Sequence, residues 1–349
     1  MPPKRKAENR GLPARWKLQH GAYYYRVPPG LEALWDGKQF FRLGKTLPES
    51  YKVWADRIGA VDVARTVGQL LDRYMLEVVP TKAVTTQSNN IVFIKAIRAA
   101  FGEFPLEAVK PRLVYQYVDA RSAKISAHRE IEILSHAFTK AVQWGYMDRH
   151  PFKGEVRLEG EKPRTRYVED WELIEALSLP ATRKKGSVKM IQAYLKIKLL
   201  TGQRRGDLLR LSSADLQEDG IHITPNKTST STGKRLIIQW SDELRAAVAE
   251  AKGARPVISP FLFCNKFGEC YVNESTGEAH GWDSMWQRYM DRLLEDTKIE
   301  TRFTEHDIRA KCASDAETLA HAQQLLAHAD GKTTERIYRR KPEKVKPLR

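Results

Sequence analysis

The sequence predicts a multidomain protein with a small N-terminal β-sheet domain, an α-helical bundle, and a mixed, mainly α-helical domain that contains a β-hairpin or small sheet. The length of 349 residues exceeds the roughly 250 to 300 residues that one hydrophobic core usually covers. The apolar pattern changes from short β-type runs to a helical period near residue 63. The stretch 155–170 is charged and poor in apolar residues, which is typical of an exposed linker.

Residues 1–62 have the pattern of a small twisted sheet. Two β-type runs, WKLQHGAYYYRV and QFFRLGK, are joined by PPGLEALWDG. The segment holds twelve basic and six acidic residues. Its aromatic residues would form the core of such a sheet, and they alternate with Arg26, Arg42 and Lys45. These outward-facing charges are expected to contact DNA phosphates, which supply most of the nonspecific affinity for DNA.

Residues 63–160 show a helical period. The first apolar face has its residues at i, i+3, i+4, i+7, i+8 and i+11, namely Val67, Leu70, Leu71, Tyr74, Met75 and Val78. Similar faces follow around 94–101, 113–118 and 131–142. Four amphipathic helices of this size predict a compact bundle.

Residues 161–349 mix the two patterns. Helical patterns in VEDWELIEALSL and YLKIKLLTGQRRGDLLRL precede two β-type runs, GIHITP and KRLIIQW. The polar segment NKTSTSTG between these runs predicts a hairpin with a loose tip. Further helices are expected around WDSMWQRYMDRLLED and DAETLAHAQQLLAHAD.

The composition favours a polyanionic partner. Lys and Arg number 59 against 43 Asp and Glu, which gives a net charge of +16. This balance suits nucleic acid, although an anionic membrane surface would also fit. The cysteines Cys264, Cys270 and Cys312 are too few for a disulfide framework, and no stretch approaches the roughly 18 apolar residues of a membrane span. We therefore expect a soluble, intracellular protein.

Six residues in four short motifs stand out in the last segment. They are Arg204 in TGQRRGD, Lys227 in NKTSTSTGK, His306 and Arg309 in EHDIR, and His328 and Tyr338 in AHADGKTTERIY. In their order and spacing they resemble the catalytic residues of the tyrosine recombinase family, the integrases of phages and mobile elements. The resemblance implies an arm-type DNA-binding domain in 1–62, a core-binding domain in 63–160 and a catalytic domain in 161–349.

Strand cleavage without a metal needs other positive charge at the phosphate. Two permanently charged guanidinium groups can bind its oxygens through paired N–H donors, and the resemblance assigns this role to Arg204 and Arg309. Arg205 is then expected to face solvent or the DNA backbone. Asp207, one helical turn after Arg204, is expected either to hold the Arg204 guanidinium or to be an exposed helix charge.

Tyr338 is the nucleophile that the resemblance implies. A phenol with a pKa of about 10 needs help to lose its proton. His306 can accept that proton, and His328 would donate a hydrogen bond to a nonbridging phosphate oxygen. Tyr338 lies ten residues after His328, one more than the commoner family spacing, which would move the phenol. Tyr289 is the alternative nucleophile, but no comparable motif surrounds it.

The leaving 5′-oxygen must also receive a proton. The family's general acid corresponds to Lys227, and Lys234, across the same hairpin tip, is the alternative and a candidate DNA contact. No phosphate-binding GxxxxGK[ST] loop, D-x-D pattern or HExxH motif is present, so we expect neither a nucleotide nor a metal cofactor.

The resemblance implies a site-specific DNA recombinase that integrates, and also excises, a phage or mobile element through a 3′-phosphotyrosyl intermediate. The expected partners are double-stranded attachment-site DNA and three further copies of the chain in a homotetramer on DNA. A directionality factor and a host DNA-bending protein are further candidates, and the expected location is the bacterial cytoplasm. Two alternatives remain open, a type IB topoisomerase and a DNA-binding regulator with a silent recombinase fold.

Overall fold

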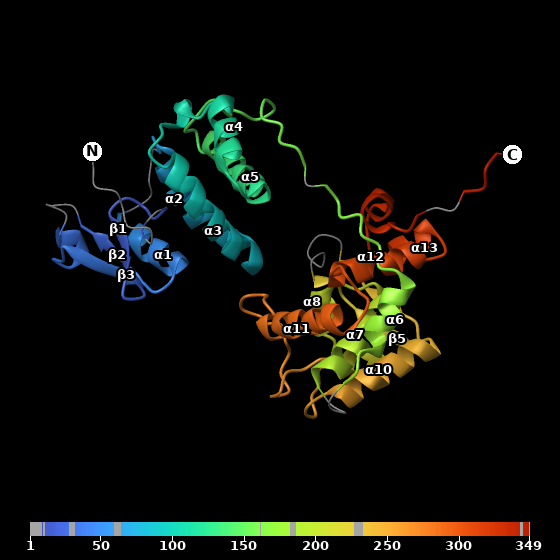
Figure 1. The fold of residues 1–349 in the computed structure, drawn as a ribbon. Coiled ribbons are helices and arrows are strands. Elements are labelled where there is room, and N and C mark those ends of the chain that lie inside the picture. The colour runs from blue at the N-terminus through green and yellow to red at the C-terminus, as the bar shows by residue number, and fades with distance from the viewer. Residues whose placement is uncertain are drawn as a thin grey trace. The chain divides into compact units, whose positions relative to one another are not determined.

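The computed structural model describes residues 9, 11–27, 32–58, 64–160, 162–181, 186–226, 233–342 and 345–348, without the side chains of Ala33 and Leu34. The chain forms two compact units, Met1–Glu161 and Lys162–Arg349 (Figure 1). Each unit is built around its own cluster of buried apolar residues.

The first unit begins with a three-stranded antiparallel sheet in the order β1 (Trp16–Gln19), β2 (Ala22–Arg26), β3 (Phe40–Gly44). His20 and Gly21, which join β1 to β2, both have positive φ angles, of 50° and 70°, as a tight two-residue hairpin requires. The 3-10 helix η2 (Glu32–Trp35) precedes β3. Helix α1 (Leu47–Ile58) packs against β3. The predicted N-terminal sheet is confirmed.

The predicted helical bundle is also confirmed. It consists of α2 (Val67–Glu77), α3 (Val84–Phe101), α4 (Pro111–Ala120) and α5 (Lys124–Gln143), with short 3-10 turns η3 (Val79–Thr81) and η4 (Leu106–Ala108). Thr66 and Gln69 form a capping box that starts α2. Figure 1 shows α3 beside α5, and these two helices form the largest helix–helix contact of the bundle.

Helix α1, which follows the sheet, shares a buried polar contact with the bundle. The Tyr51 hydroxyl, on α1, donates to Asp72 Oδ1 of α2 at 3.2 Å, and Arg98 Nη2 of α3 donates to the Tyr51 hydroxyl at 3.0 Å and to Asp72 Oδ1. All three side chains are buried. The predicted boundary between residues 62 and 63 therefore lies inside one compact unit.

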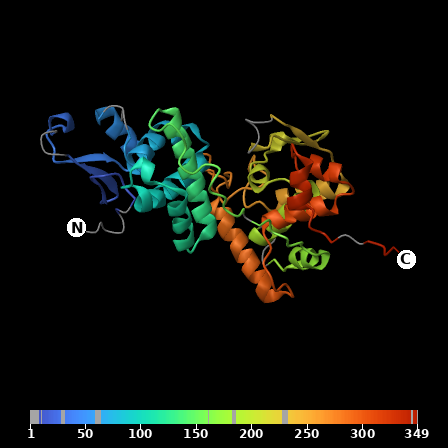
Figure 2. The same ribbon diagram turned by 90° about the horizontal axis from the view of Figure 1, so that it is seen from above.

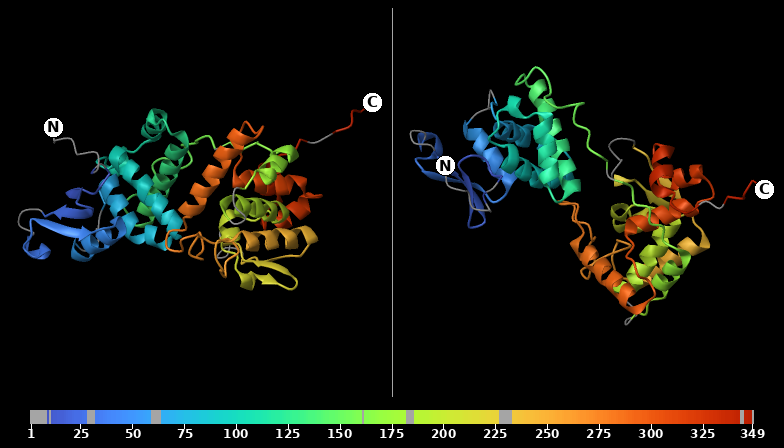
Figure 3. Two further views of the ribbon diagram at one scale, coloured as in Figure 1. Left: turned by 60° about the horizontal axis from the view of Figure 1, so that its bottom comes forward. Right: turned by 45° about the horizontal axis from the view of Figure 1, so that its top comes forward.

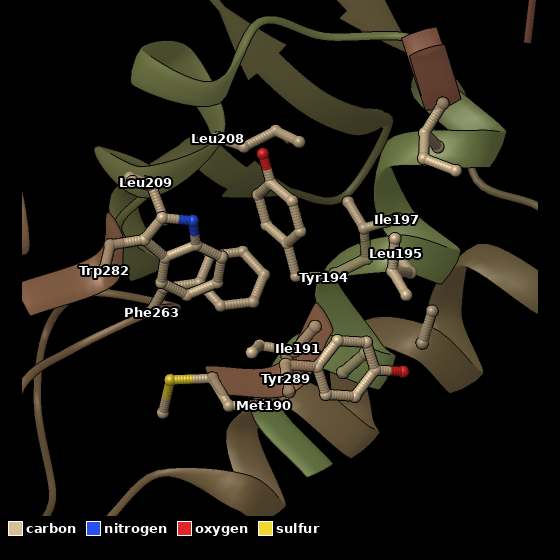
Figure 4. Close-up of a cluster of buried hydrophobic side chains, with 14 of the residues drawn as sticks. Met190, Ile191, Tyr194, Leu195, Ile197, Leu208, Leu209, Phe263, Trp282 and Tyr289 are labelled. Carbon is tan, nitrogen blue, oxygen red and sulfur yellow. The ribbon is translucent and has the colours of Figure 1, made fainter. Parts of the chain in front are cut away.

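The second unit surrounds helix α7 (Ser187–Thr201), whose residues Ile191, Tyr194 and Leu195 lie among the buried side chains in Figure 4. Its other helices are α6 (Asp170–Ser178), α8 (Arg205–Leu209), α10 (Asp242–Ala254), α11 (His280–Asp296), α12 (Glu305–Asp315), α13 (Leu319–Leu325), α14 (Gly331–Thr333), the 3-10 turn η5 (Ser213–Asp215) and the π-turn η7 (Thr334–Tyr338). α10 packs along α7.

The predicted hairpin is part of a small antiparallel sheet in the order β4 (Leu216–Gln217), β5 (Gly220–Ile223), β6 (Leu236–Ile238). The helical pattern in YLKIKLLTGQRRGDLLRL corresponds to two helices, α7 and α8. The chain leaves the helical conformation after Thr201 and resumes it at Arg205. Gly202 causes the break, because its φ of +65° lies in the left-handed region that typically ends helices.

Candidate active site

The first turn of α12 is fixed to the core of the second unit. The Glu305 carboxylate accepts hydrogen bonds from Trp282 Nε1 at 3.0 Å and from the Tyr194 hydroxyl. Tyr194 and Trp282 pack together, as Figure 4 shows, and their ring centroids are 4.7 Å apart. The two predicted residues on this helix, His306 and Arg309, therefore project from a rigid support.

The break between α7 and α8 presents Arg204, which is the N-cap residue of α8. Arg309 Nη1 donates to the carbonyl oxygen of Gly202. The Gln203 side-chain amide donates to the carbonyl oxygen of Leu325 at 2.7 Å. These contacts attach the turn before Arg204 to α12 and α13, so two motifs that are about a hundred residues apart in the sequence meet here.

Arg204 and Arg309 form a pair of like charges with spare donors. Arg309 is 1% exposed, and its burial, together with the charge of Arg204, lowers its pKa to about 10. No carboxylate lies within ion-pair distance of either guanidinium among the described residues. Arg204 Nη1 and Arg309 Nε are buried without a hydrogen-bond partner. Buried donors of this kind are costly unless a ligand satisfies them, so the pair is suited to an anion.

Tyr338 lies against the same group. Its ring centroid is 5.0 Å from that of His306 and 4.8 Å from that of His328. The Arg309 guanidinium lies 5.4 Å from the centre of the Tyr338 ring. In Figures 2 and 3 the residues from α12 to the C-terminal turn lie together in orange and red within the second unit. Of the six predicted residues, the structure thus brings Arg204, Arg309, His306, His328 and Tyr338 together.

A π-turn accommodates the long spacing before Tyr338. Residues 334–338 form this turn, and the Arg339 N–H donates to the Thr334 carbonyl oxygen at 3.1 Å. A π-turn holds one more residue than an α-helical turn. The extra residue between His328 and Tyr338 therefore coincides with a local bulge, and the Tyr338 ring still contacts both histidines. The sequence-based expectation of a shifted phenol did not take this turn into account.

Both histidines are neutral near pH 7. Burial and the charges of Arg309 and Arg204 lower the pKa of His328 to about 4. Partial desolvation of His306 and the charges of Arg340 and Arg309 lower its pKa to about 4 as well, although the residue is exposed by its accessible surface.

The contacts of His328 define its tautomer. Arg309 Nη2 donates to Nε2 at 3.2 Å, and the Nδ1 atom lies 2.9 Å from Thr334 Oγ1. Since Nε2 accepts, the proton of the neutral ring is assigned to Nδ1, which donates to Thr334.

An ionic cluster around the buried Asp307, which the sequence pattern did not reveal, fixes the segment after Tyr338. Arg340 Nη1 donates to Asp307 Oδ1 at 2.6 Å, and Arg164 Nη2 donates to Asp307 Oδ2 at 2.9 Å. Ser314 Oγ donates to the Tyr338 carbonyl oxygen at 2.9 Å. Burial opposes ionisation of Asp307, but these arginines and the N–H of Thr304 outweigh it and lower its pKa. Asp307 lies inside EHDIR, yet no local signal pairs it with residues so distant in the sequence.

The candidate general acids flank the hairpin tip. Lys227 lies outside the described residues. Lys234 lies close enough for its charge to lower the pKa of His328. Asp207 does not hydrogen-bond Arg204 among the described contacts. Its Oδ1 instead accepts the Asn226 N–H at 2.9 Å, so Asp207 supports the strand end that leads to Lys227. The side chain is buried, which corrects both expectations for it.

Two other predicted positions have clear environments. Arg205 is partly exposed and pairs with Asp283 at 2.5 Å, which fits its expected outward orientation. Tyr289 is buried, and its hydroxyl donates to the Ala176 carbonyl oxygen at 2.5 Å. Tyr289 is therefore part of the hydrophobic core, as Figure 4 shows. Its hydroxyl does not serve as a nucleophile beside the arginine pair.

In the first unit, Arg26, Arg42 and Lys45 are exposed. Arg42 pairs in register with Tyr24, and Arg26 with Phe40. Because cross-strand partners share a face of the sheet, Arg26 and Arg42 lie on the same exposed face. That face is a candidate nucleic-acid interface.

A cleft of about 540 Å³ opens at the arginine pair. Its lining includes Lys198, Arg204, Arg205, Glu305, His306 and Arg309. Lys198 and Glu305 were not among the residues predicted from the sequence. The described residues contain no cluster of three or more His, Cys, Asp or Glu side chains arranged to hold a metal ion. In the same part of the chain, no helix has the length and apolar character needed to cross a bilayer.

The second unit combines a small sheet, an arginine pair and a tyrosine between two histidines, which is the arrangement expected of a tyrosine recombinase. Residues 173–344 match the model of the phage integrase family. The integrase of Enterobacteria phage 434 is 25% identical over 246 residues, which cover 64% of this chain and 65% of that protein. The integrase of Escherichia phage lambda is 24% identical with the same coverage. Residues 173–344 therefore match the phage integrase family of tyrosine recombinases, and the chain spans just under two thirds of the length of the two curated integrases that it matches.

Solved structures agree with this assignment in fold. A lambda integrase dimer bound to a COC′ core site gives a TM-score of 0.62 at 20% identity, covering 98% of this chain and 99% of that chain. A lambda integrase tetramer bound to a Holliday junction gives 0.60 at 20% identity, covering 92% and 97%. The Tn1549 transposon integrase in complex with transposon right end DNA gives 0.61 at 17% identity, covering 77% and 93%.

Proposed function

We propose that the protein is a site-specific DNA recombinase that cleaves and rejoins DNA through a 3′-phosphotyrosyl intermediate, and that it integrates and excises a phage or mobile element. The observation that carries this proposal is the pair of buried, unpartnered donors on Arg204 and Arg309 beside the ring of Tyr338. A phosphodiester supplies the anion that these donors lack, and it would bring phosphorus to the nucleophile.

In the proposed cleavage step, Arg204 and Arg309 bind the nonbridging oxygens of the scissile phosphate and stabilise the charge that develops on them. The Tyr338 oxygen attacks phosphorus, and the neutral His306 accepts the phenol proton. The bond from phosphorus to the 5′-oxygen breaks, and Lys227 or Lys234 protonates that oxygen. The products are a 3′-phosphotyrosyl bond and a free 5′-hydroxyl.

Rejoining is the reverse reaction with a different 5′-hydroxyl. The phosphotyrosyl bond keeps the energy of the original phosphodiester, so no nucleotide is consumed. His328 would stabilise the phosphate by a hydrogen bond. Its Nε2 accepts from Arg309 in the free protein, so this role requires that Nε2 gain a proton or that the ring change partners when DNA binds.

Recombination requires two duplexes and four cleavage sites, and we propose that four copies of the chain assemble on DNA. The lambda integrase tetramer on a Holliday junction supports this arrangement by analogy of fold. We further propose an arm-type DNA-binding role for residues 1–62 and a core-binding role for 63–160. The exposed Arg26, Arg42 and Lys45 support the first role. A directionality factor, a host bending protein and a location in the bacterial cytoplasm complete the proposal.

The test uses a library of nicked duplexes with randomised cores, which lose a short fragment after cleavage and trap the covalent product. DNA attached to the protein is recovered after denaturation from wild type, Tyr338→Phe and the control Tyr289→Phe. We expect adducts from wild type and Tyr289→Phe only, and sequencing them gives the crossover site. Retention of specific native DNA without any adduct would support the regulator instead. Relaxation of arbitrary supercoiled plasmid at catalytic rates would support the topoisomerase.

A further inference from the structure

Lys198 is a buried cation without a carboxylate partner. It lies in the last turn of α7, is 1% exposed, and donates from Nζ to the Gln203 carbonyl oxygen at 2.8 Å. No carboxylate forms an ion pair with it among the described residues. The ring of Tyr194 lies 5.4 Å from Nζ, but a buried ammonium with one neutral acceptor and no counter-charge is still energetically unfavourable. Lys196, two residues earlier, shows the ordinary arrangement, because it is more exposed and pairs with Glu250 at 2.7 Å.

The contact of Lys198 is with the peptide that carries Arg204. The Gln203 carbonyl belongs to the peptide bond between Gln203 and Arg204, and Arg309 Nη1 holds the preceding carbonyl, that of Gly202. Two buried cations therefore hold successive carbonyls of the turn. This turn sets the direction in which the Arg204 side chain leaves the backbone. Lys198 also lines the same cleft as Arg204 and Arg309.

We propose that Lys198 is a positioning residue that holds the Gln203–Arg204 peptide in the geometry needed to bind the scissile phosphate, and that its ammonium adds to the positive charge of the cleft. This inference rests on the proposed recombinase function. It assigns to α7 a part of the phosphate site that the four sequence motifs do not include.

The charge state of Lys198 makes this role observable. Burial lowers its pKa to about 7, helped by the charges of Arg309 and Arg205 and opposed by those of Glu305 and Asp207. In the protein without DNA, Lys198 is therefore protonated below about pH 7 and neutral above it. A bound phosphate would raise this pKa, because an opposite charge favours the ammonium.

Other groups near Lys198 titrate elsewhere. His306 and His328 have pKa values lowered to about 4. Burial raises the pKa of Cys312 to about 11 and that of Tyr194 well above its usual value. A change in cleavage rate between pH 6 and 8 is therefore assigned to Lys198 among these neighbours.

The experiment compares wild type, Lys198→Gln and the matched control Lys196→Gln. Single-turnover adduct formation is measured from about pH 5.5 to 9 on a nicked duplex recovered from the library, at protein concentrations below saturation, where the profile reports the free protein. We expect the wild-type rate to fall as the pH rises through about 7. Lys198→Gln should be roughly ten- to a hundredfold slower at pH 6, the loss expected for a hydrogen bond from a charged donor, and its profile should be flat. Lys196→Gln should follow wild type.

Thermal unfolding separates positioning from folding. The folded-state pKa of Lys198 is lowered below its unfolded value, so its charge destabilises the fold most at pH 7 and below. Lys198→Gln should therefore melt at or above the wild-type temperature at pH 6. Cleavage by Lys198→Gln at the wild-type rate at every pH would overturn the inference. A uniform rate loss with a lower melting temperature would also overturn it, because that result indicates a structural role only.

If the wild-type protein forms no adduct, the proposed function is refuted. A second measurement then tests the role of Lys198 independently of cleavage. The probe is sulfate, compared with chloride at equal ionic strength, and the readout is the shift in melting temperature. We expect sulfate to stabilise wild type and Lys196→Gln more at pH 6 than at pH 9. If the sulfate-induced shift in melting temperature depends on pH in Lys198→Gln as it does in wild type, the inference is overturned.

Discussion

Arg340→Ala is expected to slow covalent adduct formation about thirtyfold while DNA binding is retained. The Arg340 side chain is 4% exposed and donates to Asp307 Oδ1 and to the carbonyl oxygens of Arg166 and Ile337. Removing one partner of a buried ion pair typically costs about 3–5 kcal/mol. Asp307 keeps its hydrogen bonds from Arg164 and from Thr304, so we expect about 2 kcal/mol.

That free energy acts mainly on the docking of the segment that carries Tyr338, which lies two residues before Arg340. If the docked form alone cleaves DNA, about 2 kcal/mol corresponds to a rate about thirtyfold lower. The assay is single-turnover adduct formation with saturating nicked duplex, accompanied by native DNA binding and a thermal melt.

Arg339→Ala is the matched control, because Arg339 is exposed and adjacent and keeps its backbone contact with Thr334. Equal cleavage rates for Arg339→Ala and Arg340→Ala would refute the reasoning. A collapse of DNA binding in Arg340→Ala alone would show that the ion pair supports the whole unit rather than the nucleophile segment.

Three further predictions follow from buried contacts. Tyr51→Phe removes two hydrogen bonds around Asp72 and should lower the unfolding free energy in urea by about 1–2 kcal/mol; unchanged stability would contradict this. Asp207→Ala removes the side-chain acceptor of the Asn226 N–H and should slow adduct formation about tenfold. Asp207→Asn keeps an acceptor oxygen, so its rate of adduct formation should fall less. Equal rates for the two variants would count against the role of Asp207. Tyr289→Phe should melt at a lower temperature but give the wild-type adduct yield, and a missing adduct would mean that the phenol has a chemical role.

The sequence predicted the fold well because its signals were local. The alternating aromatic runs of the first 62 residues and the helical periods after residue 63 correspond to the sheet and the bundle. The order of the four motifs was enough to select residues that the structure brings around one cleft, namely Arg204, His306 and Arg309. Such motifs can be recognised because each combines a chemical group with a turn or helix start.

The missed features depend on contacts between distant segments. No pattern in the sequence pairs Arg164, Asp307 and Arg340, since ion pairs between distant segments have no characteristic spacing. Lys198 occurs within an apolar helical stretch, where its long side chain could equally have reached solvent. The π-turn before Tyr338 was missed because one inserted residue can shift a side chain or be absorbed by the backbone, and packing decides between them.

The contact between Tyr51, Asp72 and Arg98 affects how segments of this chain can be exchanged with those of related proteins. Replacing only the first 62 residues of this chain by those of a relative would leave the ion pair of Asp72 and Arg98 without its phenol and would open the apolar surface that α1 covers. A chimera should therefore carry the whole segment Met1–Glu161 as one cassette. The junction then lies between Glu161 and Lys162, ahead of Arg164, which stays with the second unit because it donates to Asp307.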